Sequence, residues 1–378
     1  MYEYDSENLD VELDIEDKKV AANAGKGKKG QGIIIVVLLI ICFFVLAGAT
    51  TWTIIRSVGK SRLKNSVELA SIDLVTPETA SITAKEKEIW KEGWVKYNDK
   101  IYEYNDNIIT FLCMGIDKEG VVKEVAEGAN GGQADALFLV VFNSDNQTTK
   151  VVGINRNTMV GVDIFDEDGN FVSTVDAQIA TQHGFGNGVE ESCQYQINAV
   201  RRLMYNLPIH GYAALNMKAI PIINDSVGGV EVVALSDVHY GNKKVITEGE
   251  EVLLNGDQAY LYVRDRESDE FASADVRLSR QKQYLTAFLT KAKTAASKDI
   301  SLVGELYNDI TPYMTTNVTF DEVMYIAPEI VNYSFDSSSF YMIKGETVMG
   351  EKFEEFYPDE DELYDLIIDV FYKEVDVR

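Results

Sequence analysis

Ile108-Ile-Thr-Phe-Leu-Cys-Met114 is an apolar run that leads directly into Gly115-Ile-Asp117. Two similar runs follow at residues 136–142 (ALFLVVF) and 150–154 (KVVGI), and the turn-forming segment Asn143-Ser-Asp-Asn-Gln147 separates them. Strands that are apolar on both faces lie in the middle of a sheet that helices cover. The sequence therefore predicts an α/β fold with a central sheet.

Further elements are predicted around these strands. Helical patterns occur at residues 189–205, 218–226 and 272–293, and the amphipathic run 360–372 (EDELYDLIIDVFY) predicts a closing helix. Two short aromatic-rich runs flank the turn pair Asn98-Asp99, which predicts a β-hairpin.

Composition excludes several classes of protein. The chain has 378 residues, 46% of them hydrophobic, which is enough for one large or two ordinary domains. Its net charge of −26 and pI near 4.5 argue against a nucleic-acid partner. The absence of Cys-x-x-Cys, His-Glu-x-x-His and Gly-x-Ser-x-Gly argues against a zinc site, a zinc peptidase and a serine hydrolase. Cys42 lies in an apolar run, so only Cys113 and Cys193 are left to pair, and the sequence leaves that pairing open.

An apolar segment near the N-terminus predicts a membrane anchor. Residues 33–47 (IIIVVLLIICFFVLA) are apolar without interruption, and the run continues to residue 55, about the length that a helix needs to cross a bilayer. Ala47-Gly48-Ala49 resembles a signal-peptide cleavage site, but the long acidic region at residues 3–17 favours a retained anchor. The absence of a second such run predicts a single pass.

The anchor divides the chain into four parts. The slight excess of lysines before the span predicts a cytoplasmic N-terminus, and the bulk of the chain then lies on the extracellular side of the cell membrane. Residues 1–31 are predicted to be a disordered cytoplasmic tail whose basic part rests on anionic lipid headgroups. Residues 32–55 form the transmembrane helix, residues 56–92 a juxtamembrane stalk with a helical stretch at residues 84–91, and residues 93–378 the extracytoplasmic domain.

Two neighbouring segments are rich in arginine. Tyr262-Val-Arg-Asp-Arg-Glu267 and Asp275-Val-Arg-Leu-Ser-Arg-Gln281 place four arginines and a glutamine close together in an acidic chain. The guanidinium fork donates two parallel hydrogen bonds and suits phosphate oxygens. Interleaved carboxylates allow the alternative of a salt-bridged surface.

Charged residues also stand at the ends of the predicted strands. Asp117 follows the first strand, Asp135 precedes the second and Arg156 ends the third. Ligands of α/β proteins commonly bind at such strand ends. Two aspartates held close together suit Mg²⁺ or Mn²⁺, although each alone also fits a residue that caps a turn.

The order of these segments resembles the LytR-CpsA-Psr family of cell-envelope proteins. The family's pattern of Gly-x-Asp, Arg-x-Asp-Thr, Pro-Arg-Asp-Thr and a late arginine block is similar to motifs spread over residues 90 to 290. The matching segments are Gly115-Ile-Asp117, Gln133-Ala-Asp135-Ala136, Asn155-Arg156-Asn157-Thr158, Val227-Gly-Gly-Val-Glu-Val232, Leu254-Asn-Gly-Asp-Gln-Ala-Tyr-Leu-Tyr-Val-Arg264-Asp-Arg266 and Asp275-Val-Arg277-Leu-Ser-Arg280-Gln281. The late arginine block is the specific part of the resemblance.

The resemblance implies an extracytoplasmic phosphotransferase with one three-layer α/β/α domain and a central mixed sheet, preceded by one transmembrane helix. Such a protein takes a glycopolymer from a polyprenyl-pyrophosphate carrier at the membrane and attaches it to peptidoglycan, assisted by Mg²⁺ or Mn²⁺ on Asp117 and Asp135. The polyprenyl tail requires an apolar groove. The resemblance assigns pyrophosphate binding to Arg156, Arg264, Arg266, Arg277, Arg280, Gln281 and Gln133, and catalysis to Asp135, Asp275, Arg264 and Arg266. Asp135 and Asp275 are alternative general bases.

Two positions depart from the family's pattern. Gln133 stands where the family has an arginine, and Asn157 stands where it has an aspartate. Both departures change the expected charge of the site. Two alternatives therefore stand beside the transferase: a non-catalytic protein of the envelope that binds pyrophosphoryl lipids or acts as a scaffold, and a polyprenyl-pyrophosphate hydrolase.

Overall fold

The computed structural model describes residues 72–125, 131–166, 168–265 and 273–376. The predicted tail (1–31), the predicted membrane span (32–55) and Arg266 lie outside these residues. None of the helices in the described part is both long enough and apolar enough to pass through a bilayer.

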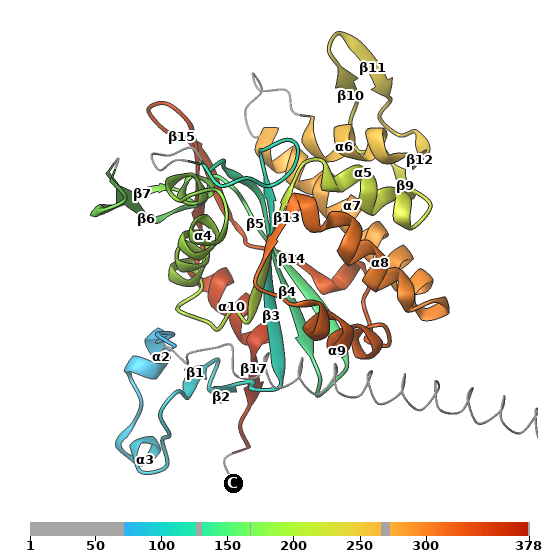
Figure 1. The fold of residues 1–378 in the computed structure, drawn as a ribbon. Coiled ribbons are helices and arrows are strands. Elements are labelled where there is room, and N and C mark those ends of the chain that lie inside the picture. The colour runs from blue at the N-terminus through green and yellow to red at the C-terminus, as the bar shows by residue number, and fades with distance from the viewer. Residues whose placement is uncertain (1–71, 126–130, 167, 266–272, 377–378) are drawn as a thin grey trace, which may run out of the picture. The chain divides into compact units, whose positions relative to one another are not determined.

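A six-stranded mixed sheet forms the centre of the fold (Figure 1). Its strands, in spatial order, are β13 (Met314–Thr316), β8 (Gly211–Asn216), β3 (Ile108–Ile116), β4 (Ala134–Asn143), β5 (Thr148–Ile154) and β14 (Phe340–Met342). Strand β3 is antiparallel to β4 and parallel to β8, and β5 is antiparallel to β4 and parallel to β14. The predicted α/β fold with a central mixed sheet is confirmed.

Helices cover both faces of this sheet, because the strands are apolar on both sides. Leu112 and Met114 of β3 belong to the main core together with residues of α4 (Glu190–Leu203) and α10 (Glu360–Phe371). On the other face, Phe138 of β4 packs with Leu278 of α7. Helices α7 (Ser273–Lys298), α8 (Ser301–Ile310) and α9 (Phe320–Ile330) lie on this second side (Figure 1).

Several predicted elements are present with small shifts at their ends. Strands β1 (Val95–Tyr97) and β2 (Lys100–Tyr104) form the expected hairpin, and Asn98 and Asp99 adopt the positive φ angles that its turn requires. Helix α4 corresponds to the helix predicted at 189–205, α10 to the one at 360–372, and α5 (Ala219–Ser226) to the one at 218–226.

Other elements were not predicted, and most of them are short. Helix α7 extends to Lys298, five residues past the predicted helix at 272–293, and a separate helix, α6 (Gly256–Arg264), carries the start of the first arginine segment, up to Arg264. The remaining elements are β6 (Met159–Phe165), β7 (Phe171–Gln178), η1 (Ile179–Phe185), β9 (Val230–Val233), β10 (Val238–Tyr240), β11 (Lys243–Ile246), β12 (Glu251–Leu254), η2 (Thr311–Tyr313), η3 (Ser337–Ser339), β15 (Gly345–Met349), β16 (Glu354–Pro358) and β17 (Tyr372–Glu374). Strands β6–β7, β9–β12, β10–β11 and β15–β16 form two-stranded sheets, and β17 pairs with β2.

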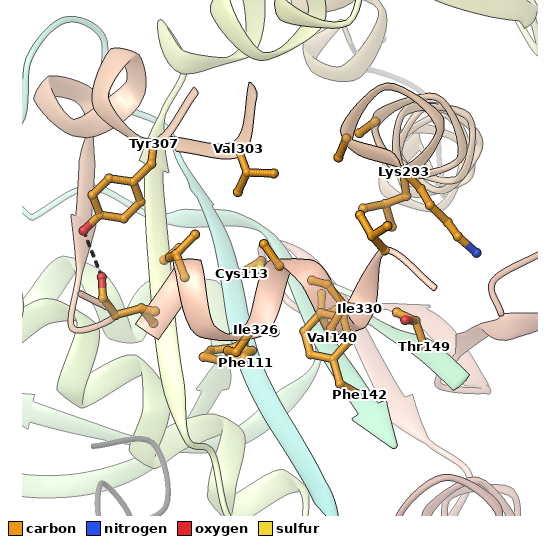
Figure 2. Close-up of a pocket in the computed structure, with 18 of the residues that line it drawn as sticks. Phe111, Cys113, Val140, Phe142, Thr149, Lys293, Val303, Tyr307, Ile326 and Ile330 are labelled. Carbon is orange, nitrogen blue, oxygen red and sulfur yellow. Dashed lines mark hydrogen bonds between the residues drawn. The ribbon is translucent and has the colours of Figure 1, made fainter. Parts of the chain in front are cut away.

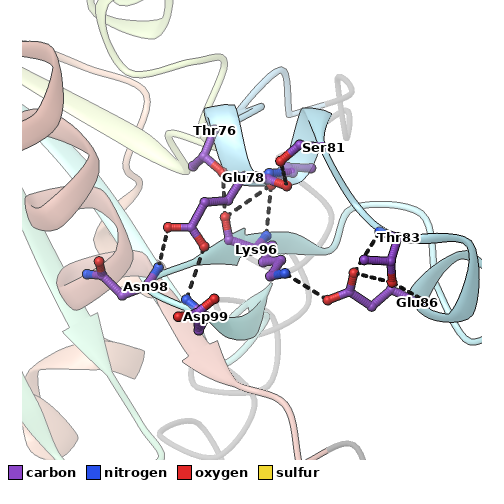
Figure 3. Close-up of polar contacts among 9 residues, drawn as sticks. Thr76, Glu78, Ser81, Thr83, Glu86, Lys96, Asn98 and Asp99 are labelled. Atoms are coloured by element: carbon purple, nitrogen blue, oxygen red, sulfur yellow. Dashed lines mark hydrogen bonds and ion pairs between the residues drawn. The ribbon is translucent and has the colours of Figure 1, made fainter.

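Residues 72–92 pack against the domain, as their polar contacts show (Figure 3). It contains two short helices, α2 (Pro77–Ala80) and α3 (Ala84–Lys87), so the helix predicted at 84–91 is only one turn long. The carboxylate of Glu78 accepts backbone hydrogen bonds from both residues of the β1–β2 turn, each at 3.0 Å, and Glu86 forms a 2.8 Å ion pair with Lys96.

Leu74 belongs to the main core and is 4% exposed. The expected boundary at residue 93 therefore falls inside the packed unit, because residues from 72 onward already contact it.

The two cysteines of the described domain do not pair. Both are free: Cys113 lies on the β3 face that packs towards α7, whereas Cys193 belongs to the core on the α4 side. Burial raises the pKa of the Cys113 thiol to about 11 and that of the Cys193 thiol to about 12.

His210, just before β8, is held in its neutral form. Burial lowers its pKa to about 4, and its Nδ1 accepts a 3.1 Å hydrogen bond from the backbone N–H of Thr110. The unfolded chain therefore binds a proton that the folded chain rejects at any pH between about 4 and the ordinary histidine value of 6.5.

Because His210 has a lower pKa in the folded chain than in the unfolded chain, we expect the fold to lose stability in acid. Lowering the pH from 6.5 to 4 should reduce the free energy of unfolding of the wild type by about 3 kcal/mol more than that of His210→Asn, whose neutral amide retains an acceptor. Urea denaturation at a series of pH values measures this. Parallel pH profiles for the two proteins would contradict the assignment.

The contact of Leu74 with the core gives a second expectation. Leu74→Ala should lower the free energy of unfolding by about 2–4 kcal/mol, because it removes buried methyl groups and leaves a cavity. Val75→Ala is the matched control, because the neighbouring Val75 is 57% exposed. A loss of less than about 0.5 kcal/mol for Leu74→Ala, measured in the same denaturation experiment, would place this segment outside the cooperative unit.

Candidate active site

An aspartate and two arginines meet at one edge of the sheet. Strand β4 runs antiparallel to β3 and β5, so the start of β4 meets the ends of its two neighbours. Asp135 near the start of β4 lies 3.2 Å from Arg156 (Oδ1 to Nε) and 3.3 Å from Arg277 of α7 (Oδ2 to Nη1). These side chains are 17%, 15% and 8% exposed, so solvent screens the pairs only weakly.

Gln133 and Asp117 extend this cluster across the sheet edge. The side-chain oxygen of Gln133 accepts a hydrogen bond from Arg156 Nη2, and its backbone N–H donates a 2.6 Å bond to Asp117 Oδ1. Gly132 has φ +84°, and a Cβ added there would lie 2.8 Å from Asp117 Oδ1. The missing side chain at position 132 therefore leaves room for the Asp117 carboxylate.

The two predicted metal ligands, Asp117 and Asp135, thus lie at the ends of adjacent strands. The described residues hold no group of three or more His, Cys, Asp or Glu that would bind a metal by themselves. Mg²⁺ commonly takes one or two carboxylates and completes its shell with water and substrate phosphates. Asp135 Oδ1 is buried and, beside its ion pair with Arg156, accepts no hydrogen bond from the described residues, so this donor set fits Mg²⁺.

Arg264 lies at the last turn of α6, which begins at the Asn255–Gln258 capping box. Its side chain is 53% exposed and forms a 3.7 Å ion pair with Glu119. Tyr260, one helical turn earlier, carries the guanidinium over its ring at 5.2 Å, and its hydroxyl donates a 2.9 Å hydrogen bond to Glu119. These contacts hold an exposed arginine in place.

Arg280 and Gln281 face the backbone of the preceding segment. Arg280 donates a hydrogen bond to the carbonyl of Asp265 and lies over the ring of Tyr262, and Gln281 donates to the carbonyl of Val263. Both side chains are buried, at 3% and 9% exposure. They support the end of α6, and these contacts disfavour the predicted role of Arg280 and Gln281 in binding pyrophosphate.

Asp275 joins α7 to two other parts of the domain. Its Oδ1 accepts a 2.6 Å hydrogen bond from Asn155, and its Oδ2 accepts a 3.0 Å bond from Thr347 on β15. Both oxygens are thus occupied by neutral donors. Asp275 thus links α7 to Asn155 and to β15, whereas Asp135 lies directly between the arginines.

A polar cavity of about 520 Å³ is lined by three of the four predicted arginines that the structure describes. It is lined by Arg156, Arg264, Arg277, Tyr260, Leu261, Asp265, His239, Tyr240 and Gly241. Its charged walls and open volume suit an anionic ligand.

A second cavity, of about 410 Å³ and lined almost entirely by apolar side chains, lies between the sheet and helices α7, α8 and α9 (Figure 2). Phe111 and Cys113 of β3 and Val140 and Phe142 of β4 form its sheet wall. The opposite wall includes Leu289, Ala292, Val303, Tyr307, Ile326 and Ile330.

The apolar cavity and the charged cluster around Asp135 lie along the same strands. On β3, Phe111 and Cys113 line the apolar cavity, and Asp117 stands just beyond the end of the strand. On β4, Asp135 stands near the start of the strand, and Val140 and Phe142 line the apolar cavity further on. Along both strands, the apolar cavity is thus separated from the charged residues by only a few residues.

Asn157, the second departure from the family's pattern, faces away from Asp135. Its amide donates a 3.3 Å hydrogen bond to Glu354 on β16 and accepts a 3.1 Å bond from Gln178. An aspartate here would face the Glu354 carboxylate, so an amide suits this position.

Sequence reasoning did not single out Tyr260, Glu119 or the walls that α8 and α9 contribute to the apolar cavity. The sequence pattern could have identified Tyr260, because residues four apart on a helix share one face and Tyr260 precedes Arg264 by four. No pattern in the sequence points to Glu119, since it reaches the site from a loop that is distant from α6 in the sequence.

Comparison with known proteins identifies the family. The LytR_cpsA_psr family model matches residues 74–366. Curated relatives include the polyisoprenyl-teichoic acid–peptidoglycan teichoic acid transferases TagU of Bacillus cereus (28% identical over 218 residues, 57% of this chain and 62% of the relative) and Bacillus mycoides (29% over 219 residues, 57% and 62%). The matched region spans less than two thirds of these relatives' length.

Solved structures share the fold. The crystal structure of TagV from B. subtilis has a TM-score of 0.55 at 21% identity and is matched over 70% of this chain and 96% of that one. A structure of TagT bound to LIIa-WTA has a TM-score of 0.51 at 20% identity, over 70% of this chain and 89% of that one. The family match covers most of the chain and includes every strand of the central sheet, and the charged site at the sheet edge falls within it. The chain belongs to the LytR_cpsA_psr family.

Proposed function

We propose that this protein transfers a glycopolymer from a polyprenyl-pyrophosphate carrier to peptidoglycan on the extracellular side of the membrane. The observation that carries the proposal is the succession of an arginine site and an apolar cavity along the same strands. A lipid pyrophosphate needs both environments, one for its charged head and one for its tail. The family's TagU relatives are named as transferases of teichoic acid to peptidoglycan, which supports the reaction class.

The arginines bind the pyrophosphate. Arg156 and Arg277 already hold an anion, the carboxylate of Asp135, and Arg264 faces the same cavity. Charge that develops on the leaving phosphate is stabilised by donors that are fixed before the reaction. Asp117 and Asp135 would hold Mg²⁺, which neutralises further phosphate charge when it is bound.

The transfer exchanges one phosphorus–oxygen bond for another. A hydroxyl of the wall sugar forms a bond to the phosphorus that carries the glycopolymer. The bond from this phosphorus to the bridging oxygen breaks, and the carrier leaves as polyprenyl phosphate. The proton of the hydroxyl passes to a carboxylate, for which we propose Asp135, because it lies between the two arginines that would bind the phosphate, whereas Asp275 links Asn155 to Thr347.

The departures at positions 133 and 157 are compatible with this activity. Gln133 accepts a hydrogen bond from Arg156, which an arginine at this position would be unable to do. Asn157 is buried and is hydrogen-bonded to Gln178 and Glu354.

The first test is the removal of an arginine. Arg156→Ala should lower the transfer rate by about 10²–10³-fold, as expected when a fixed donor to a developing charge is lost. The assay incubates the full-length protein in detergent with Mg²⁺, a synthetic polyprenyl-pyrophosphoryl disaccharide and peptidoglycan fragments, and detects the sugar-phosphate adduct by mass spectrometry. The matched control is Arg202→Ala, because Arg202 is paired with Asp163 and lines neither cavity.

Other outcomes of this assay identify the alternatives. Free sugar phosphate without an adduct would indicate a hydrolase. Intact donor that still binds to the wild type would indicate a lipid-binding or scaffold protein. An Arg156→Ala variant as active as Arg202→Ala would remove the arginine site from the mechanism.

The second test narrows the apolar cavity. Ala292→Phe places a ring in this space, so the KM for a long-chain polyprenyl donor should rise about tenfold, whereas the KM for a donor with two or three isoprene units should change little. Thr294→Phe on the exposed side of α7 is the control. Steady-state kinetics measures both values, and thermal denaturation checks that the variants are folded. Equal changes for short and long donors would mean that the tail binds elsewhere.

A further inference from the structure

The polar cavity extends beyond the arginines to a hairpin that the reaction above leaves unused. Strands β10 and β11 form this hairpin, and His239, Tyr240 and Gly241 line the cavity together with Tyr260 and Arg264. The inference below rests on the proposed transfer reaction and names the part of the site that receives the acceptor.

Tyr240 is an aromatic side chain on the surface of the cavity. It is 70% exposed at the end of β10, which is unusual for a large ring. Together with Tyr260 it gives a strongly charged cavity two aromatic walls. A ring with an apolar face and a polar hydroxyl suits a sugar, whose ring offers C–H groups on its faces and hydroxyls at its rim.

The hairpin is fixed to the arginine segment. The backbone N–H of His239 donates a 2.8 Å hydrogen bond to the carboxylate of Asp265, the residue that follows Arg264. Asp237 accepts a 2.9 Å bond from the backbone N–H of Glu248 and forms an ion pair with Lys244. These contacts set the position of Tyr240 relative to Arg264 before any ligand binds.

The in-line geometry of phosphoryl transfer indicates which sugar this cavity receives. In phosphoryl transfer, the attacking and leaving oxygens lie roughly in line on opposite sides of the phosphorus. The leaving group carries the polyprenyl chain, and the proposed function assigns its tail to the apolar cavity. The polar cavity shares no lining residue with the apolar one, so we expect the attacking hydroxyl to enter through the polar cavity, which Tyr240 and Tyr260 line.

We propose that Tyr240 and Tyr260 form the subsite for the acceptor saccharide, with Tyr240 stacking on the sugar ring whose hydroxyl attacks. Tyr260 also holds Arg264, so Tyr240 is the residue that reports on acceptor binding alone.

The experiment compares the KM values for acceptor and donor in the full-length protein, with the mass-spectrometric assay above and a peptidoglycan disaccharide-peptide as acceptor. Tyr240→Ala should raise the KM for the acceptor about tenfold and leave the KM for the donor and the rate at saturating acceptor unchanged. Tyr240→Trp should retain an acceptor KM close to that of the wild type. Tyr357→Ala is the matched control, because it removes an exposed tyrosine from β16, which belongs to a different hairpin.

Two kinetic outcomes would overturn the assignment. A rise in the donor KM alone would assign the cavity to the sugar of the carrier-linked glycan, and unchanged values for both substrates would place the hairpin outside the site.

If the wild-type protein forms no adduct, the result counts against the transferase reaction. The acceptor subsite is then tested by measuring acceptor binding directly. Calorimetry with the same disaccharide-peptide then decides. A dissociation constant about tenfold weaker in Tyr240→Ala supports the subsite, and an equal value refutes it.

Discussion

The register of three antiparallel strands determines the site. Because β4 runs opposite to β3 and β5, the start of one strand and the ends of two others meet at the same edge. Asp117, Asp135 and Arg156 lie at or near the ends of three different strands, and the pairing of these strands brings them together. A shift of one residue in β4 would turn Asp135 to the opposite face of the sheet and separate it from Arg156.

The charges at this edge also explain how an acidic chain holds buried arginines. Arg277 is buried, and leaving a guanidinium in such a place without a counter-charge would cost several kcal/mol. The carboxylate of Asp135 supplies that charge in the ligand-free protein. An incoming phosphate can share or replace this role, so binding exchanges one anion for another and requires no new burial of unpaired positive charge.

Much of this arrangement could be predicted from the sequence. The apolar strands, α4 and α10 were recognisable because their patterns are long and regular, and Asp135, Arg156 and Arg277 were recognisable because charged residues flank strands or occur in a dense arginine block. The motif did not reveal which way each guanidinium points, so Arg280 was grouped with Arg277 although it supports the backbone of the preceding segment. The apolar cavity was expected only as a groove, because its walls come from helices α7 to α9, which meet β3 and β4 only in three dimensions.

The state of the two thiols has a consequence for the chain's chemistry in an oxidising environment. Only a thiolate attacks a disulfide or reacts readily with an oxidant. Burial raises the pKa values of Cys113 and Cys193 far above neutrality, and the sheet keeps the two residues on opposite sides. The folded domain therefore carries free cysteines that are both protonated and mutually inaccessible. It would tolerate oxidising conditions without a disulfide.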